Sequence, residues 1–217
     1  FLPLFTGRTD TEIAFFSVRS CSVTYGAENG DTLSASITVT KDTSNDRIKI
    51  VTSGVPDHPT CDPDDTDAGD TCYNDPIETY FSDQNVRDYV PLSPVEASSS
   101  TGLPAATIGY ARNGVAIFSA YSRPCTDAIS DEAIGFDKCQ GHPMEDGTYH
   151  YHQAASCIEG YLDAWDTKSE FFIGVALDGF PIYSMYDSDG ELVTNSQLDD
   201  CHGYDPGTGY RYIANTE

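Results

Sequence analysis

Two stretches of the chain have closely similar sequences: residues 108–119 read IGYARNGVAIFS, and residues 173–184 read IGVALDGFPIYS. Six of the twelve positions are identical, and in both stretches two apolar segments flank an Asn-Gly or Asp-Gly pair. Such a pair is the strongest local signal of a β-hairpin, because both central residues of a type I′ turn need a positive φ. The apolar residues run continuously along both arms, which indicates burial on both faces. We therefore expect two similar hairpins in the interior of the protein.

The similarity continues after each hairpin. The first is followed by FDKCQGH at 136–142 and GTYHYH at 147–152, and the second by LDDCHGY at 198–204 and GYRYI at 209–213. In both cases a cysteine, a glycine two residues later and a Tyr-x-Tyr segment follow in the same order. Recurrence of a whole pattern of this kind indicates an internally duplicated unit.

The sequence predicts a mainly β fold: a single disulfide-stapled domain with antiparallel sheets and an internally duplicated β-hairpin unit. The domain would span residues 1–217, with an N-terminal β region at about 1–56, an acidic loop at 57–76, and the duplicated unit at about 105–157 and 170–213.

Helix signals are scarce in this chain. The best candidate is a short helix at 130–135, where Asp131 and Glu132 would suit a helix N-terminus. Strand patterns outside the repeat lie at 22–25 and 32–40, which would form a hairpin around Asn29-Gly30, and at 47–52.

The composition excludes several classes of protein. The chain has 35 acidic and 11 basic side chains, a formal net charge of −24 and a pI near 4.1. This charge repels phosphate backbones, so no nucleic-acid partner is expected, and it attracts cations. No run of about eighteen apolar residues is present, so no membrane span is expected. A hydrophobic fraction of 39% is enough for a buried core and argues against a disordered chain.

The seven cysteines indicate an oxidising compartment, because none has the CxxC spacing of a zinc ribbon or a thioredoxin-like site. We expect a secreted, extracellular protein. Cys61 and Cys72 bracket an acidic loop and are predicted to pair. Cys139 and Cys157 flank the histidine segment closely enough to link its ends. The odd number leaves a free thiol, an intermolecular bond or a partner beyond residue 217 as alternatives.

The loop between Cys61 and Cys72 carries aspartates that resemble a calcium loop, with Asp62, Asp64 and Asp67 as candidate ligands. Their spacing does not match the EF-hand, which has Gly at the sixth position and Glu at the twelfth. A solvated surface loop is the simpler interpretation, and weak calcium binding is the alternative.

Three of the five histidines, His142, His150 and His152, fall within eleven residues. On a strand, the period of two places His150 and His152 on one face and Tyr149 and Tyr151 on the other. His142 would join them across a turn at Asp146-Gly147. Three neutral imidazoles suit zinc or copper, and a catalytic site would leave one coordination position open. The alternative is a set of hydrogen-bonded histidines in a tyrosine-rich core.

Other residues are candidates for completing the site. His58, His202 and Asp137 are possible additional ligands, and nearby carboxylates could also fix an imidazole tautomer. In the second copy, Tyr204, Arg211 and Ile213 replace the three histidines. The histidines are therefore dispensable for the fold and specific to one site.

Several motifs together resemble a known family. They are GVPDHP at 54–59, the hairpin at 108–118, CQGHP at 139–143 with YHYH at 149–152, IGVALDGFPIY at 173–183, and LDDCHG at 198–203. This set resembles the YHYH-domain family of mostly secreted proteins, and it implies a fold and a site more than a reaction. Family members often carry a second Tyr-His-Tyr-His, where this chain has Tyr210, Arg211, Tyr212 and Ile213.

Three hypotheses about function follow. The first is a secreted acidic protein that binds a transition metal, copper or zinc, through its histidines. The second is a metal-dependent hydrolase or oxidase, with Asp178 or Glu145 as a general base. The third is an acidic matrix, adhesion or mineral-associated protein that interacts with calcium. A deep pocket beside the histidines would favour the enzyme, and closure by four protein ligands would favour a structural metal. Metal ions are the expected partners, and the sequence does not identify a protein partner.

Overall fold

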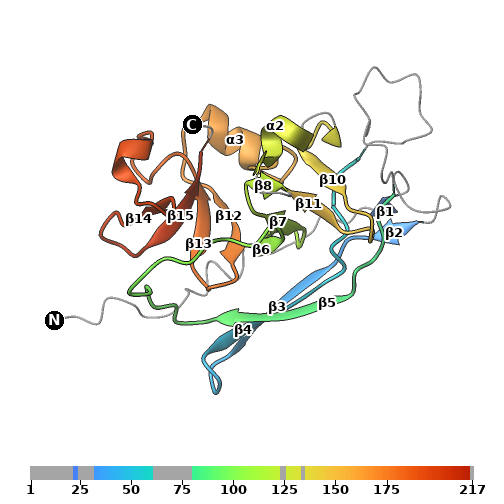
Figure 1. The fold of residues 1–217 in the computed structure, drawn as a ribbon, viewed down its shortest axis with the longest axis horizontal. Helices are drawn as coiled ribbons and strands as arrows, with labels where there is room; N and C mark the ends of the chain where they lie inside the picture. Colours follow the sequence, from blue (N-terminus) through green and yellow to red (C-terminus); the bar gives the residue numbers. More distant parts are fainter. Residues whose placement is uncertain (1–21, 24–31, 61–79, 123–125, 133–134, 216–217) are drawn as a thin grey trace.

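The computed structural model of the protein describes residues 22–23, 32–60, 80–122, 126–132 and 135–215 (Figure 1). Within these ranges the fold is mainly β, as predicted. No helix in this part of the chain is long and apolar enough to cross a membrane. The strands are β1 (Ser22–Val23), β2 (Leu33–Ser34), β3 (Ile37–Asp42), β4 (Arg47–Thr52), β5 (Val86–Pro91), β6 (Thr107–Ala111), β7 (Ala116–Phe118), β8 (Tyr121–Ser122), β9 (Thr126–Asp127), β10 (Gly141–Pro143), β11 (Tyr149–Tyr151), β12 (Phe172–Ala176), β13 (Pro181–Ser184), β14 (Gly203–Tyr204) and β15 (Arg211–Ala214). The helices are α2 (Ala128–Glu132), α3 (Tyr161–Asp166) and the 3₁₀ helix η3 (Asn195–Gln197).

The largest element of the fold is a sheet of eight strands in the order β10-β11-β7-β6-β12-β13-β15-β14. Both predicted hairpins are present, as the antiparallel pairs β6–β7 and β12–β13, and they meet through an antiparallel β6–β12 pairing. Outside them, β11 pairs parallel with β7 and β15 pairs parallel with β13. These parallel pairings depart from the expected antiparallel pattern, because each outer strand is reached through a long connection and not through a tight turn.

From its centre outward, the sheet has the same strand order and directions in both halves (Figure 1). The identical glycines of the two hairpins lie at this centre. A Cβ atom on Gly109 would collide with the carbonyl group of Val175, and one on Gly174 would collide with that of Tyr110. The two chain segments can therefore approach closely only because both positions are glycine. The internal duplication stays a prediction, with which this symmetric order agrees.

The prediction of a type I′ turn in both hairpins is wrong. Gly114 and Gly179 have positive φ values of 91° and 94°, whereas Asn113 and Asp178 do not. The N–H of Gly114 donates to the carbonyl oxygen of Ala111 at 2.8 Å, and the second hairpin has the equivalent bond. This pattern is a type I turn followed by a left-handed glycine, which is the usual three-residue hairpin loop. The side chains of Asn113 and Asp178 bind neighbouring tyrosines instead.

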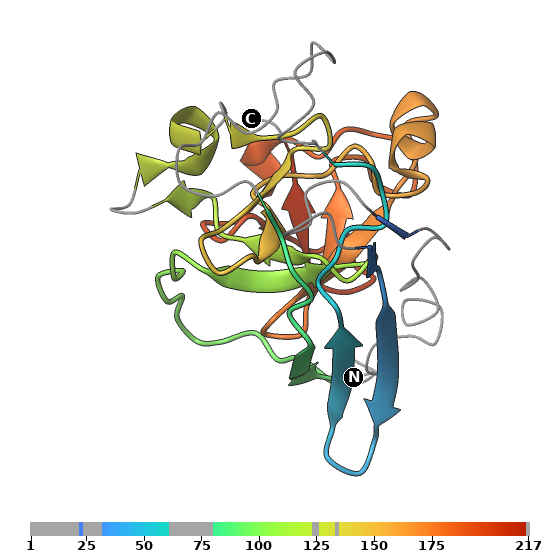
Figure 2. The same ribbon diagram turned by 90° about the vertical axis from the view of Figure 1, so that its right-hand side faces the viewer.

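A second sheet, in the order β3-β4-β5, packs against the centre of the first. Strand β4 coincides with the predicted strand at 47–52, and its buried Ile48 and Ile50 contact Tyr110 and Val175 of the large sheet in one hydrophobic cluster. The β3–β4 hairpin extends away from the rest of the molecule (Figure 2).

The N-terminal region differs in part from expectation. β1 and β2 pair antiparallel, as a hairpin around residues 29–30 requires, but the turn lies outside the described residues. The strand expected at 32–40 is divided into β2 and β3, which pair with different partners. The helix expected at 130–135 is α2, which begins two residues earlier, at Ala128.

The disulfide Cys139–Cys157 is present, with Cα atoms 5.1 Å apart. It links the loop before β10 to the segment after β11 and so closes the chain around the histidine segment. The predicted pair Cys61–Cys72 and the candidate calcium ligands Asp62, Asp64 and Asp67 lie outside the described residues, so these predictions stay untested.

Candidate metal centre

The hairpin of β10 and β11 brings the three predicted histidines together. Its antiparallel register places His142 directly opposite His150. The pleat of β11 continues to His152, so that His150 and His152 lie on one face and Tyr149 and Tyr151 on the other. The Nε2 atom of His150 is 3.0 Å from that of His142 and 3.0 Å from that of His152. The three histidines therefore lie together, as the sequence predicted, and their role as metal ligands stays a prediction.

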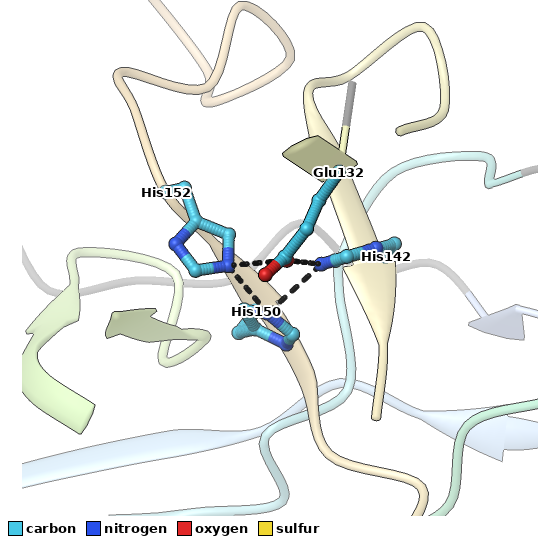
Figure 3. A group of neighbouring side chains, drawn as sticks. All are labelled: Glu132, His142, His150 and His152. Carbon is cyan, nitrogen blue, oxygen red and sulfur yellow. Dashed lines mark hydrogen bonds and ion pairs between the residues drawn. The ribbon is translucent and has the colours of Figure 1, made fainter. Parts of the chain in front are cut away.

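A fourth residue, Glu132 at the end of α2, completes the group. Its Oε2 atom is 3.2 Å from Nε2 of His142 and 3.1 Å from Nε2 of His152 (Figure 3). The four ligand atoms all lie within 4.8 Å of one another. Sequence reasoning placed Glu132 on a short helix but did not connect it to the histidines. The only available signal was an acidic residue ten positions before His142, and nothing in its spacing defines the approach of α2 to β10.

Hydrogen bonds behind two of the imidazoles define their tautomers. Nδ1 of His150 is 3.1 Å from the carbonyl oxygen of Thr148, and Nδ1 of His152 is 2.7 Å from that of Ser119. Because a carbonyl oxygen only accepts, both Nδ1 atoms carry the hydrogen, and both Nε2 atoms present lone pairs to each other. The carboxylate of Glu132 also only accepts. Lone pairs of His150, His152 and Glu132 therefore point toward the same place.

The site is buried and surrounded by aromatic rings. His142, His150 and His152 are 4%, 2% and 9% exposed. The ring of Phe118 stacks on His150 with centroids 4.0 Å apart, and Phe136 meets His142 edge-on at 4.8 Å. The stacked ring of Phe118 gives His150 an apolar environment, which disfavours its charged form.

The electrostatics of the site follow from this burial. Burial, and then the neighbouring His142 and His152, hold the pKa of His150 well below its ordinary value of 6.5. The contact with His142, and then the contact with His152, hold the pKa of Glu132 well below its ordinary value. At neutral pH the site therefore presents a neutral imidazole at His150 and a carboxylate at Glu132, which are the forms that coordinate a metal.

Two of the possible additional ligands lie on the tyrosine face of β11 and not at the cluster. His58 is 1% exposed, and its Nε2 atom is 2.6 Å from the hydroxyl of Tyr151. Asp137 accepts a hydrogen bond from the hydroxyl of Tyr149 at 2.6 Å and others from the backbone of its own loop. Their prediction as ligands is not supported, because both side chains are hydrogen-bonded to the hydroxyl groups of these tyrosines. His58 also lies near Cys139 and Cys157, whose sulfurs are bonded to each other.

The remaining candidates lie elsewhere. His202 is exposed on a loop, in a left-handed conformation with φ of 59°. Glu145 is exposed at the turn between β10 and β11. Asp178 is exposed in the β12–β13 turn and accepts a hydrogen bond from the hydroxyl of Tyr212 at 2.5 Å. None of the three belongs to the four-residue group.

The second half of the sheet repeats the tyrosine face without the histidines. Tyr210 donates to Asp199 at 2.7 Å, as Tyr149 does to Asp137, and Asp199 also binds its own loop. Arg211, in the place of His150, pairs with Glu170 and lies over the ring of Tyr183. Cys201, in the place of Cys139, is a free and exposed thiol. Only the first half therefore carries the donor cluster.

The fold and site define a mainly β, disulfide-containing domain with a buried group of three histidines and one glutamate. Residues 88–202, more than half of the chain, match the model of the family described as YHYH protein. The chain therefore belongs to the YHYH protein family. No curated protein and no solved structure matches the chain.

Proposed function

We propose that the protein binds one transition-metal ion through Nε2 of His142, His150 and His152 and a carboxylate oxygen of Glu132. The observation that carries this proposal is the convergence of lone pairs. Nε2 of His150 and Nε2 of His152 are 3.0 Å apart, and both Nδ1 atoms are already committed to carbonyl oxygens. Two acceptors at this distance repel each other unless a cation lies between them.

The donor set fits a transition metal. Imidazole nitrogen and carboxylate oxygen are ligands of zinc and copper, whereas calcium prefers oxygen donors alone. The Nδ1 hydrogen bonds of His150 and His152 resemble the contacts that orient metal-ligating histidines in general. In addition, Nδ1 of His142 is buried and has no hydrogen-bond partner among the described residues. The polar contacts of this imidazole are therefore those of its Nε2 atom, with His150 and Glu132.

Closure of the group by four protein donors favours a protein that holds its metal. The candidate bases of the hydrolase or oxidase hypothesis, Asp178 and Glu145, do not belong to the group, so no observation favours that alternative. The hypothesis of a matrix or calcium-interacting protein keeps only its original support, the net charge of −24. We further propose that the protein is secreted, because its cysteine usage and its disulfide suit an oxidising compartment.

Titration of the metal-free protein tests this function. Zinc or copper(II) should bind with a stoichiometry of one and raise the melting temperature, because a ligand that binds only the folded state stabilises it. His152→Ala should abolish most of this rise. His202→Ala, the change of an exposed histidine outside the group, is the matched control and should respond as the parent protein does. Equal responses of the parent and His152→Ala proteins would refute the proposal.

A further inference from the structure

The four donors of the proposed site form a ring of contacts. In the order His142, His150, His152 and Glu132, neighbouring donor atoms are separated by 3.0, 3.0, 3.1 and 3.2 Å. Figure 3 shows these four contacts as dashed lines that close into a ring. Glu132 and His150 occupy opposite corners, as do His142 and His152.

The pairs at opposite corners are farther apart than the neighbours. A carboxylate oxygen of Glu132 lies within 3.2 Å of Nε2 of His142 and of Nε2 of His152, whereas the described residues show no such contact between Glu132 and His150. The centroids of the His142 and His152 rings are 5.7 Å apart, against 4.5 Å for His142–His150 and 4.8 Å for His150–His152. A tetrahedral set of donors would instead have six similar separations.

The dimensions agree with four donors around one metal in a plane. A square with edges of 3.0–3.2 Å has diagonals of about 4.4 Å, so each donor lies about 2.2 Å from the centre, close to ordinary metal–nitrogen and metal–oxygen distances. The diagonal also falls within the 4.8 Å that encloses all four ligand atoms.

We infer that the site is arranged for a tetragonal metal ion, and that its preferred occupant is copper(II) and not tetrahedral zinc. This inference rests on the proposed function. Nitrogen and oxygen donors in a square arrangement are typical of copper(II) and nickel(II), and copper(II) binds more tightly than nickel(II) to a given set of such ligands. No fifth protein donor joins the group among the described residues. Phe118 and Phe136, which contact the rings of His150 and His142, offer no ligand atom.

Spectra of the full chain loaded with single metals test the inference. With one equivalent of copper(II), electron paramagnetic resonance should give an axial signal with a large parallel copper splitting and additional splitting from three nitrogens. With cobalt(II), the visible absorption should be weak, because only tetrahedral cobalt(II) absorbs strongly. His150→Ala should remove one nitrogen from the copper signal and weaken copper binding at least tenfold.

The outcomes distinguish a failure of the tetragonal arrangement from a failure of the metal-binding function. Strong visible absorption of the cobalt(II) protein, or a copper signal with a small parallel splitting, would overturn the tetragonal arrangement while the metal-binding function stands. Failure of copper(II), cobalt(II) and zinc alike to bind would overturn the proposed function and the inference with it.

Discussion

At the scale of single residues, the site depends on where each imidazole carries its hydrogen. Ser119 and Thr148 contribute only backbone carbonyl oxygens, yet these fix the tautomers of His152 and His150. The lone pairs that result have no donor between them. Glu132 adds a negative charge to the same point. Each of these contacts makes a cation at the centre of the group more favourable.

Replacing the carboxylate tests the contribution of Glu132. Glu132→Gln should weaken metal binding by a factor on the order of ten or more, because a neutral amide is a poorer ligand and removes the charge. Competition with a chelator of known affinity measures the change. Glu145→Gln removes a carboxylate from the exposed turn of the same hairpin and should leave the affinity unchanged. Equal losses in the two variants would mean that only general electrostatic attraction is involved.

The stability of the metal-free protein should depend on pH through His150. Its pKa is held well below 6.5 in the folded protein, whereas the unfolded chain takes up a proton near 6.5. The stability contributed by the neutral imidazole is therefore present above pH 6.5 and is lost as the pH falls toward the folded pKa. Melting temperatures between pH 7.5 and 5 should fall more steeply for the parent than for His150→Gln. Parallel curves would contradict this assignment.

At the scale of elements, the two faces of β11 make different contacts. One face carries His150 to the cluster, and the other anchors the strand through Tyr149 and Tyr151. The carboxylate of Asp137 accepts hydrogen bonds from the hydroxyl of Tyr149 and from two backbone N–H groups of the loop that leads to His142. The tyrosines of the motif therefore hold in place the strands that present its histidines.

The pseudo-equivalent tyrosines give a matched test of this anchoring. Tyr149→Phe should destabilise the protein by about 1–3 kcal/mol, because the buried carboxylate of Asp137 loses a hydrogen bond. Tyr210→Phe makes the same change against Asp199, which is exposed, and should cost about 0.5 kcal/mol or less. Urea unfolding of both variants provides the comparison. A cost for Tyr210→Phe as large as that for Tyr149→Phe would contradict the anchoring argument.

Sequence reasoning predicted what local periodicity controls and missed what depends on tertiary approach. The alternation of tyrosine and histidine at 149–152 and the turn before it were enough to predict the cluster of His142, His150 and His152. The position of Glu132 depends on the tertiary placement of α2, which packs against β8 and β9 and which no sequence spacing encodes. His58 was considered as a ligand because of its type, whereas its neighbours in space are Tyr149 and Tyr151.

At the scale of the whole molecule, a symmetric sheet carries an asymmetric function. The two halves share their strand order, their glycine-mediated contact and their Tyr–Asp anchors. They differ in the donor cluster and in the disulfide, and both of these features belong to the first half. The free Cys201 and the ion pair of Arg211 occupy the corresponding places in the second half. This difference allows each half to act as an internal control for the other.

The disulfide stabilises the half that carries the site. It closes a loop with a sequence separation of 18 residues, for which the loss of chain entropy in the unfolded state amounts to about 3 kcal/mol. The double variant Cys139→Ser/Cys157→Ser should lose stability of that order in denaturant unfolding. Its metal affinity should also fall, because the bridge joins the chain on either side of β10 and β11. Cys201→Ser, the change at the free thiol, should leave both quantities unchanged. A double variant as stable as the parent would show that the bridge is not needed for stability.

Elemental analysis of the purified protein tests most directly whether the histidine cluster holds a metal ion. After loading and removal of excess metal, the parent and His202→Ala proteins should each retain about one transition-metal ion per chain. His150→Ala should retain almost none while keeping the circular dichroism of the folded protein. Retention of the same metal content by His150→Ala, or of no metal by the parent, would contradict the account.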